Sequence, residues 1–342
     1  MKLSFYPLTL KLKHTFQIAR ETRSIQNNVA VQLKDSEETC GIGEAAPTGF
    51  FGEELHNVTG MLIKAADLLG NADPFSIEDI TSSLANRFPV DAAARAAIDI
   101  ALYDMVGKKL KVPLYKLLGL NQPGTRLTSF TIGLDTIEKM CEKVEEAKDF
   151  PVLKIKVGKG NDIEMLGELR KITKAVFRVD ANTGWTADEA IRKLHKMEKL
   201  DVELVEQPFP VGNIDALRRI RGQVKIPVFA DEDIRTSSDI PALSEVVEGI
   251  NIKLMKCGGI REALRTIHTA RAHGLKVMIG CNIESSLSIT AAAHLASLAD
   301  YVDLDGHLLI TNDPYRGVIV DKGRLILPEG NGLGVVEKGS GK

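Results

Sequence analysis

The chain has 342 residues, of which 26% are charged, and its formal net charge is -2 at pH 7. This balance gives no electrostatic reason to expect nucleic acid or an anionic membrane surface as a partner. No apolar run approaches the roughly 20 residues that a membrane-spanning helix needs. We therefore expect a soluble protein with a sizeable core, organised as one large domain or two smaller ones.

The cysteines and the first residues indicate the compartment. Among the four cysteines there is no C-x-x-C pair and no disulfide-like cluster, which favours a reducing environment. The opening sequence MKLSFYPLTLKLKH alternates like a strand and lacks the apolar core and cleavage site of a secretory signal. These features predict a cytoplasmic protein.

The first 120 residues are predicted to form strands followed by helices. Leu8, Leu10 and Leu12 alternate with polar residues, and 29–33 is a second strand-like segment. The alanine-rich stretch 91–102 predicts a helix that packs closely against its neighbours. Strands followed by helices predict an α+β capping domain, which we place at residues 1–120.

From about residue 125, short apolar strands alternate with amphipathic helical stretches. Such alternation predicts βαβ units and a parallel sheet. The predicted strands include 152–157, 177–180, 202–206, 228–230, 249–254, 276–279 and 301–305.

A polar or reactive residue ends each predicted strand at a nearly constant spacing. The successive steps are 25, 24, 26, 25, 25, 25 and 24 residues. The residues are Thr131, Lys156, Asp180, Glu206, Asp231, Lys256, Cys281 and Asp305. Eight such units predict an α/β fold of the TIM type, a (β/α)8 barrel over residues 121–310, with its chemistry at the C-terminal ends of the strands.

The tail, residues 311–342, is expected to leave the barrel and return to the capping domain. Its apolar segments 317–320 and 324–327 predict a pair of strands. The glycine cluster 330–334 follows a strand without opening a clear helix, so we interpret it as a turn and not as a phosphate-binding loop.

Three carboxylates end three consecutive strands, in the segments FRVDAN, ELVEQP and VFADED. Because neighbouring strands lie about 4.8 Å apart, Asp180, Glu206 and Asp231 would repel one another unless a cation lay among them. Oxygen-only ligands favour Mg²⁺ first and Mn²⁺ second. One aspartate at a strand end would more often cap a helix, but three in succession predict a metal site. Glu232 and Asp233 are rivals for the place of Asp231.

The segment LKIKVG, residues 153–158, places two lysines on one face of the second barrel strand. Lys256 ends the sixth strand, which stands across an eight-stranded ring from the second. A substrate held on the metal would therefore meet a lysine on each side. We predict that Lys156 and Lys256 are catalytic, whereas Lys253, three residues before Lys256, is expected to point away from the site.

Lys154 lies two residues deeper than Lys156 on the same face of the strand. Its charge would lower the pKa of Lys156 from the ordinary value of about 10.4, at which a lysine is almost wholly protonated at pH 7. Lys154 can also contact the carboxylate of a substrate, so we count it as a substrate-binding residue.

These motifs resemble the enolase superfamily, and specifically its muconate lactonizing enzyme subgroup. The resemblance rests on the lysines and carboxylates just described, on 41–53, which looks like a capping-domain signature, and on 96–119, which looks like the linker helix. Enolase-superfamily sites pair a Lys or His base with Mg²⁺, and none of the seven histidines falls on the strand-end spacing. The resemblance implies removal of a proton next to a carboxylate. A lysine on each face then implies racemisation or epimerisation.

The eighth strand carries Asp303 and Asp305 on one face. They lie too far round the ring to join the metal and would suit a cationic group such as an ammonium. This D-x-D resembles the dipeptide epimerases, in which it holds the free α-ammonium of the substrate. The same resemblance places Thr131 and Cys281 in the substrate pocket, although a buried threonine or cysteine is more often a packing residue.

We therefore expect a Mg²⁺-dependent dipeptide epimerase that inverts the α-carbon of the C-terminal residue, with L-Ala-D/L-Glu as the favoured substrate. The segment 18–23 resembles the family's mobile loop, and Arg20 or Arg23 could pair with the glutamate side chain. Glu21 between them argues against an acidic substrate. The stretch ADED also departs from the ADES expected of the family, which would change the surroundings of the metal.

Two alternatives stay open at this point. An o-succinylbenzoate synthase, N-acylamino acid racemase or cycloisomerase of the same subgroup would use the same lysines, but its substrate lacks the free ammonium that the D-x-D suits. A barrel that only binds a metal complex would need structural lysines. Barrels of this type often assemble as homo-oligomers, and no interface can be read from the sequence.

Overall fold

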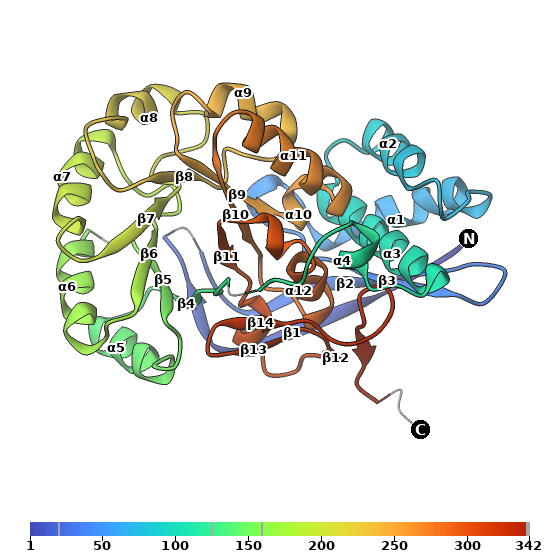
Figure 1. The fold of residues 1–342 in the computed structure, drawn as a ribbon. Helices are drawn as coiled ribbons and strands as arrows, with labels where there is room; N and C mark the ends of the chain where they lie inside the picture. Colours follow the sequence, from blue (N-terminus) through green and yellow to red (C-terminus); the bar gives the residue numbers. More distant parts are fainter. Residues whose placement is uncertain (20, 125, 159, 340–342) are drawn as a thin grey trace.

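The computed structural model describes residues 1–19, 21–124, 126–158 and 160–339. Its largest element is a sheet of eight parallel strands in the order β11-β10-β9-β8-β7-β6-β5-β4, which curls into a nearly closed barrel (Figure 1). A parallel bridge between Thr128 and Val302 joins the two ends of the sheet. The strands are β4 Phe130–Ile132, β5 Val152–Lys156, β6 Val176–Asp180, β7 Val202–Glu206, β8 Val228–Ala230, β9 Gly249–Lys253, β10 Lys276–Gly280 and β11 Tyr301–Asp303. The predicted (β/α)8 barrel is confirmed.

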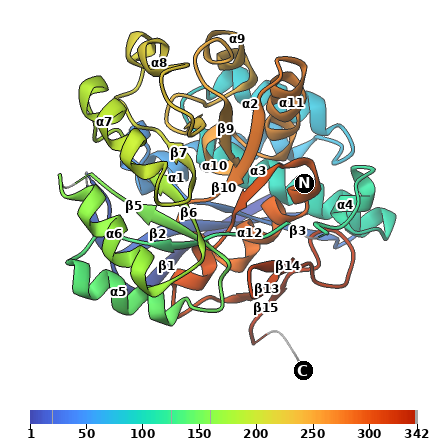
Figure 2. The same ribbon diagram turned by 60° about the vertical axis from the view of Figure 1, so that its left-hand side comes forward.

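Helices cover the outside of the barrel, as Figure 2 shows from a second direction. Residues that face the helices and residues that face the interior alternate along each strand. The interior is filled below the mouth by Leu204, Phe229 and Met278, which form a small cluster of their own. The helices are α5 Ile137–Glu146, α6 Asp162–Ile172, α7 Ala187–Met197, α8 Ile214–Ile220, α9 Ile240–Leu243, α10 Leu254–Cys257, α11 Ile260–Ala272 and α12 Ser286–Ala293, with short 3₁₀ turns η2 Ser237–Asp239, η3 Ala296–Leu298 and η4 Gly306–Leu309.

The N-terminal part, which we call the cap, is an antiparallel three-stranded sheet with helices packed on it. Its elements are β1 Lys2–Gln17, β2 Thr22–Lys34, β3 Cys40–Ala45, η1 Gly49–Phe51, α1 Leu55–Gly70, α2 Ile77–Arg87, α3 Ala92–Leu110 and α4 Leu114–Leu117. The predicted alanine-rich helix is α3, and it approaches β3 so closely that a Cβ atom at Gly41 would lie 2.0 Å from the Ala101 carbonyl oxygen. Small residues on both surfaces therefore allow the sheet and the helix to meet.

The β1–β2 hairpin is long, and its tip extends from the cap toward the mouth of the barrel (Figure 1). A backbone hydrogen bond from the Leu134 amide to the Gln17 carbonyl, 2.8 Å long, holds the tip beside the loop that follows β4. The cap thus covers one side of the mouth, as the sequence predicted for a capping domain.

The tail contacts both the barrel and the cap. Its elements are β12 Tyr315–Arg316, β13 Ile319–Asp321, β14 Arg324–Ile326 and β15 Val336–Glu337. β13 and β14 are the predicted strand pair. The Leu333 amide donates to Asp104 of α3 at 2.9 Å, and Gly332 adopts a φ of +62° within the glycine cluster. The division at residues 120 and 310 remains a proposal.

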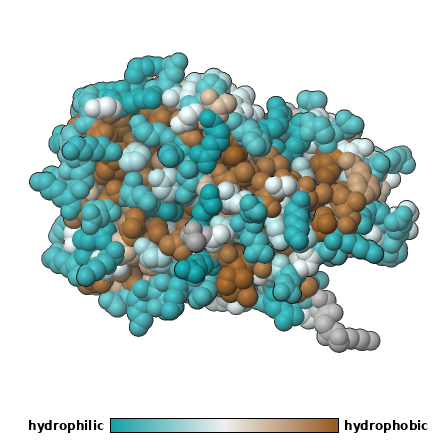
Figure 3. Space-filling model, viewed as in Figure 1, coloured by the Kyte–Doolittle hydropathy of each residue, from teal (hydrophilic) through white to brown (hydrophobic). Residues whose placement is uncertain are grey.

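The surface in Figure 3 is mostly hydrophilic, with apolar side chains gathered over α1 and α3. Ile63 on α1 and Leu110 on α3 are among the exposed large hydrophobic residues. Over the described ranges, no helix is both long enough and apolar enough to cross a membrane.

Candidate active site

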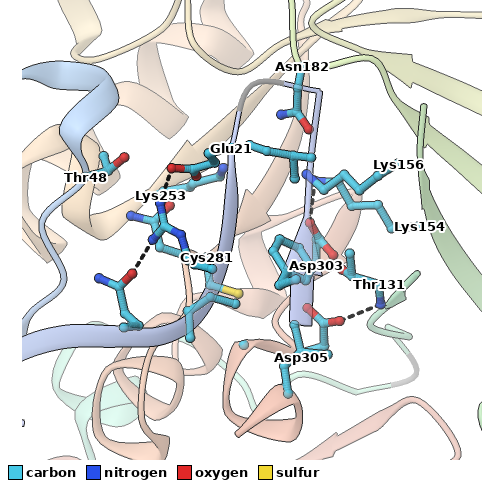
Figure 4. Close-up of a pocket in the computed structure, with 18 of the residues that line it drawn as sticks. Glu21, Thr48, Thr131, Lys154, Lys156, Asn182, Lys253, Cys281, Asp303 and Asp305 are labelled. Atoms are coloured by element: carbon cyan, nitrogen blue, oxygen red, sulfur yellow. Dashed lines mark hydrogen bonds and ion pairs between the residues drawn. The ribbon is translucent and has the colours of Figure 1, made fainter. Parts of the chain in front are cut away.

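A cavity of about 100 Å³ opens at the C-terminal end of the barrel, between the strand ends and the β1–β2 hairpin. From the barrel, its lining includes both lysines of β5 and the two aspartates at the C-terminal end of β11, Asp303 and Asp305, and from the cap it includes Glu21 and Arg23. Figure 4 shows Lys154, Lys156, Asp303 and Asp305 on one side of the cavity and Glu21 on the other.

Three buried carboxylates lie together at the bottom of this mouth. One oxygen each of Asp180, Glu206 and Asp231 lies within 4.8 Å of the others. Their closeness follows from the ladder, because Asp180 and Glu206 are direct partners on β6 and β7 and Asp231 comes directly after β8. The predicted grouping of these carboxylates is therefore confirmed as geometry.

The two lysines of LKIKVG point into the barrel, as predicted. Lys154 Nζ lies 2.8 Å from Glu206 Oε2, 2.8 Å from Asp303 Oδ2 and 3.1 Å from Asp180 Oδ2. Lys156 Nζ lies 2.7 Å from Asp180 Oδ2. Burial alone would lower the pKa of Lys154, but attraction to Asp303, Glu206 and Asp180 raises it well above its ordinary value.

The expected orientation of Lys253 is wrong. Its side chain lines the cavity, and Nζ lies 2.7 Å from Asp231 Oδ2. β9 ends at Lys253, which pairs with Gly280 on β10, and the chain turns into α10 at Leu254. Lys253 therefore holds the strand-end position on β9 that the even spacing had assigned to Lys256.

Lys256 lies in α10, behind Asp231. Its ammonium donates to the Asn251 carbonyl at 3.0 Å and to both the carbonyl and the carboxylate of Asp231. Lys256 does not occur among the described residues that line the cavity. All its donors face protein oxygens, so the predicted contact between Lys256 and a substrate does not fit this position.

Asp303 and Asp305 lie on the wall of the cavity beside β4. Asp303 Oδ1 accepts a hydrogen bond from Ser129 Oγ at 2.7 Å, and Asp305 Oδ2 accepts one from the Thr131 amide at 2.6 Å. Burial, and then the charge of Asp303, raises the pKa of Asp305 to about 7. Thr131, Lys154 and Cys281 line the same cavity, so the structure brings all five predicted substrate-binding residues together.

Buried amides that the sequence did not reveal support the carboxylates. Asn251 Nδ2 donates to Glu206 Oε1 at 2.7 Å. Gln207, in a left-handed conformation with φ +38°, accepts from the Asp231 amide at 2.9 Å and donates to Asp233 Oδ2 at 2.7 Å. This contact turns Asp233 away from the cluster. Two features of the sequence could have revealed these amides. Gln207 directly follows the strand-end Glu206, and Asn251 lies two residues before Lys253 on the same inward face of β9.

The outer wall of the cavity comes from the hairpin tip. Arg23 forms an ion pair with Glu21 and donates to Gln26 Oε1. Arg20, the other arginine considered for this wall, lies outside the described residues. An acidic side chain of a ligand could pair with Arg23 only in competition with Glu21.

The donor set fits a hard divalent cation. It consists of three buried carboxylates, each of which offers an oxygen within 4.8 Å of the others. Mg²⁺ prefers such ligands, usually with a few protein carboxylates and the remaining positions filled by other oxygens. Fold and site together define a capped (β/α)8 barrel with an acidic metal-binding mouth.

Comparison with known proteins identifies the family. Residues 6–119 match the mandelate racemase / muconate lactonizing enzyme N-terminal domain, and residues 136–338 match the enolase C-terminal domain-like family. The chain therefore belongs to the mandelate racemase and muconate lactonizing enzymes of the enolase superfamily, which confirms the resemblance seen in the sequence.

Several relatives in this family carry names that describe the epimerisation of dipeptides. The chain is 41% identical over 339 residues to an L-Ala-D/L-Glu epimerase of Bacteroides thetaiotaomicron, covering 98% of this chain and 88% of the relative. A dipeptide epimerase of Enterococcus faecalis V583, solved with Mg and L-Leu-L-Tyr, matches with a TM-score of 0.93 and 34% identity over 98% of both chains. One of Cytophaga hutchinsonii, solved with Mg and D-Ala-L-Val, has a TM-score of 0.94 and 29% identity, covering 99% of this chain and 96% of that one.

Proposed function

We propose that this protein is a Mg²⁺-dependent dipeptide epimerase, an isomerase that inverts the α-carbon of the C-terminal residue of a dipeptide. The observation that carries the proposal is the placement of Lys156 and Lys253. They come from β5 and β9, four strands apart in a ring of eight, and both line the cavity above the carboxylates. The names of the relatives support the same reaction.

Asp180, Glu206 and Asp231 are proposed to hold the metal. A bound Mg²⁺ would supply positive charge for the negative charge that develops on the substrate carboxylate when its neighbouring proton leaves. Lys154 contacts two of these carboxylates from the side of β5, and we propose that its ammonium also faces the substrate carboxylate.

Lys156 and Lys253 are proposed to move the proton. One amine, in its neutral form, takes the α-proton and becomes an ammonium, while the ammonium on the other side gives a proton to the opposite face of the same carbon. The substrate is inverted with no net gain or loss of protons, and the enzyme returns with the two lysines in exchanged protonation states. Lys253 replaces Lys256 in this role, because the ammonium of Lys256 is bonded to Asp231 and Asn251 behind the site.

Asp303 and Asp305 are proposed to bind the free α-ammonium of the dipeptide, with Thr131 and Cys281 beside it. Substrates of an o-succinylbenzoate synthase, an N-acylamino acid racemase or a cycloisomerase have no such ammonium to place beside these two buried carboxylates. The ammonium therefore favours a dipeptide over those alternatives. L-Ala-L-Glu is the first substrate to test, although the pairing of Arg23 with Glu21 leaves room for neutral side chains.

The test is incubation of a dipeptide library with the protein and Mg²⁺ in D₂O, followed by mass spectrometry. We expect deuterium at the α-carbon of the C-terminal residue and the appearance of both epimers. A Lys156→Ala variant should lose epimerisation, which would exclude a barrel that only binds a metal complex. If folded, Mg²⁺-loaded protein exchanged no proton in any dipeptide, the proposal would fail, and succinylbenzoate formation and N-acylamino acid racemisation would be tested next.

A further inference from the structure

A second, larger cavity adjoins the candidate active site. It has a volume of about 350 Å³ and lies between β1, β4, α5, η4 and β13. Its lining is mainly apolar and includes Leu12, Phe16, Phe130, Phe150, Leu309 and Val320. All six side chains are partly buried, so they form an accessible apolar lining and not a closed core.

Charged or ionisable residues form part of the lining of this cavity, at Lys13, His14, Lys143 and Glu146. His14 Nε2 and Glu146 Oε2 lie 3.0 Å apart, and both side chains are more than half exposed. Lys143 is bound to Asp135 at 3.0 Å. His14, Glu146 and Lys143 thus have partners of their own, while the apolar part of the lining offers Phe130 and Phe150, whose ring centroids lie 4.8 Å apart. The cavity suits an apolar group.

The wall between the two cavities is one strand thick. Thr131 is the Cα partner of the inward-facing Lys154, whereas Phe130 is the partner of Leu153, which faces outward. Successive side chains on a strand point to opposite faces, so Phe130 faces the second cavity and Thr131 the active site.

Phe16, Thr131 and Leu309 line both cavities. Phe16 can lie at this boundary because residue 133 is glycine: a Cβ atom there would come within 3.3 Å of the Phe16 ring. Leu309 ends η4, the short turn that begins directly after Asp305. The boundary therefore includes two partly buried apolar side chains, Phe16 and Leu309, beside the proposed ammonium site.

We propose that the second cavity binds the apolar side chain of the N-terminal residue of the dipeptide. This inference rests on the proposed function, which places the α-ammonium at Asp303 and Asp305. Because Asp305 is bonded to the Thr131 amide, the carbon that bears this ammonium would lie beside the shared wall. Its side chain then has an apolar space of about 350 Å³ to enter, whereas the mouth cavity alone has about 100 Å³.

The experiment fills the second cavity without changing the first. Val320→Trp places a large side chain in the second cavity, because Val320 lines only that one. Ile319→Trp is the matched control, since the neighbouring Ile319 is 63% exposed and does not line either cavity. Wild type and both variants are compared on L-Ala-L-Glu and L-Leu-L-Glu for kcat/KM, and calorimetry with Mg²⁺ gives the Kd of each dipeptide. Val320→Phe replaces Val320→Trp if thermal unfolding shows that the tryptophan variant does not fold.

We expect the wild type to prefer L-Leu-L-Glu, and Val320→Trp to lower the Leu/Ala ratio of kcat/KM and of affinity at least tenfold, as loss of an apolar pocket typically does. Ile319→Trp should leave both ratios at the wild-type value. Epimerisation with an unchanged ratio in the filled variant would overturn the pocket assignment and leave the proposed function standing. Absence of epimerisation of either dipeptide by the wild type would overturn both.

Discussion

Substitution of Lys253 and Lys256, one at a time, separates the catalytic lysine from the structural one. Lys253 contacts a single carboxylate oxygen and lines the cavity, whereas Lys256 donates to two carbonyls and the Asp231 carboxylate. Removal of a general base typically costs about 10²–10⁴ in rate. A buried carbonyl that loses its donor typically costs about 1–3 kcal/mol of stability.

We therefore expect Lys253→Met to reduce kcat for epimerisation by about 10²–10⁴, with a small change in stability, because Lys256 still neutralises Asp231. Lys256→Met should instead lower the unfolding midpoint by on the order of 10 °C, because the buried carbonyls of Asp231 and Asn251 lose their donor even though Lys253 still pairs with Asp231.

Epimerisation of L-Ala-L-Glu and thermal unfolding are measured side by side for the two variants. In D₂O, Lys253→Met should still exchange the α-proton of one epimer through Lys156 without forming the other epimer. The opposite pattern, with an active Lys253→Met variant and a stable but inactive Lys256→Met variant, would refute the assignment and restore the one made from the even strand spacing.

Three further outcomes are expected. Asp303→Asn combined with Asp305→Asn should abolish dipeptide turnover while Mg²⁺ affinity, measured by calorimetry, stays within a few-fold, and persistent turnover would contradict the ammonium assignment. Chelation of divalent cations with EDTA should remove activity, and added Mg²⁺ should restore it; full activity in EDTA would argue against a metal role for the carboxylates. His294 is buried between the Tyr115 amide and the Leu333 carbonyl, and burial lowers its pKa to about 4. Its neutral form favours the folded state, so this contribution is complete above about pH 6.5 and is lost as the pH falls toward 4, by up to about 1.4 kcal/mol per pH unit. Urea unfolding at pH 7.5, 6 and 5 should show a smaller loss for His294→Gln than for the wild type, and equal slopes would refute this account.

The barrel and its acidic mouth could be predicted because parallel strands end at one level. Lys156, Asp180 and Glu206 are successive partners in the ladder, so a regular spacing along the chain corresponds to closeness in space. The strand spacing alone was therefore enough to predict that Asp180 and Glu206 lie close together. Thr131 and Asp305, the first and last residues of the regular series, are likewise close in the structure, where the Thr131 amide donates to Asp305.

The prediction failed on β9 because a strand ends where its neighbours stop pairing with it. Gly280 is the last residue of β10 and pairs with Lys253, so the ladder cannot extend to Lys256. The segment Leu254–Cys257 then forms a helical turn, which local sequence does not distinguish from a continued strand. Because the end of β9 was placed three residues too late, the site was assigned to Lys256, which lies behind it, and not to the inward-facing Lys253.

The buried amides were missed for a different reason. Gln207 matters through contacts with Asp231 and Asp233, which lie more than 20 residues along the chain, and its left-handed backbone has no marker in residue type. Such contacts depend on the folded loops after β7 and β8. The regular spacing of the strands reveals the residues at the strand ends. It does not reveal the polar side chains that hold those residues in place.

The position of the cap over the mouth depends on a buried polar contact. Glu44 of β3 accepts hydrogen bonds from Asn28 Nδ2 at 2.7 Å and from the Ser285 amide at 3.1 Å, and Asn28 also donates to the Ile283 carbonyl at 3.1 Å. Burial raises the pKa of Glu44. These directional bonds join β2 and β3 to the loop after β10, which also carries Cys281 of the cavity wall.

Apolar packing alone would let the cap slide over the barrel, whereas a satisfied polar network favours one arrangement. The residues proposed for chemistry all come from barrel strands or the turns that follow them, and Glu21 and Arg23 come from the cap. Because the Glu44 contact fixes the cap independently of Glu21 and Arg23, substitutions at the hairpin tip can change which side chain is accepted without moving the lysines or carboxylates. Differences in substrate between related chains with the same mouth are then expected to concentrate in this hairpin and in the walls of the two cavities.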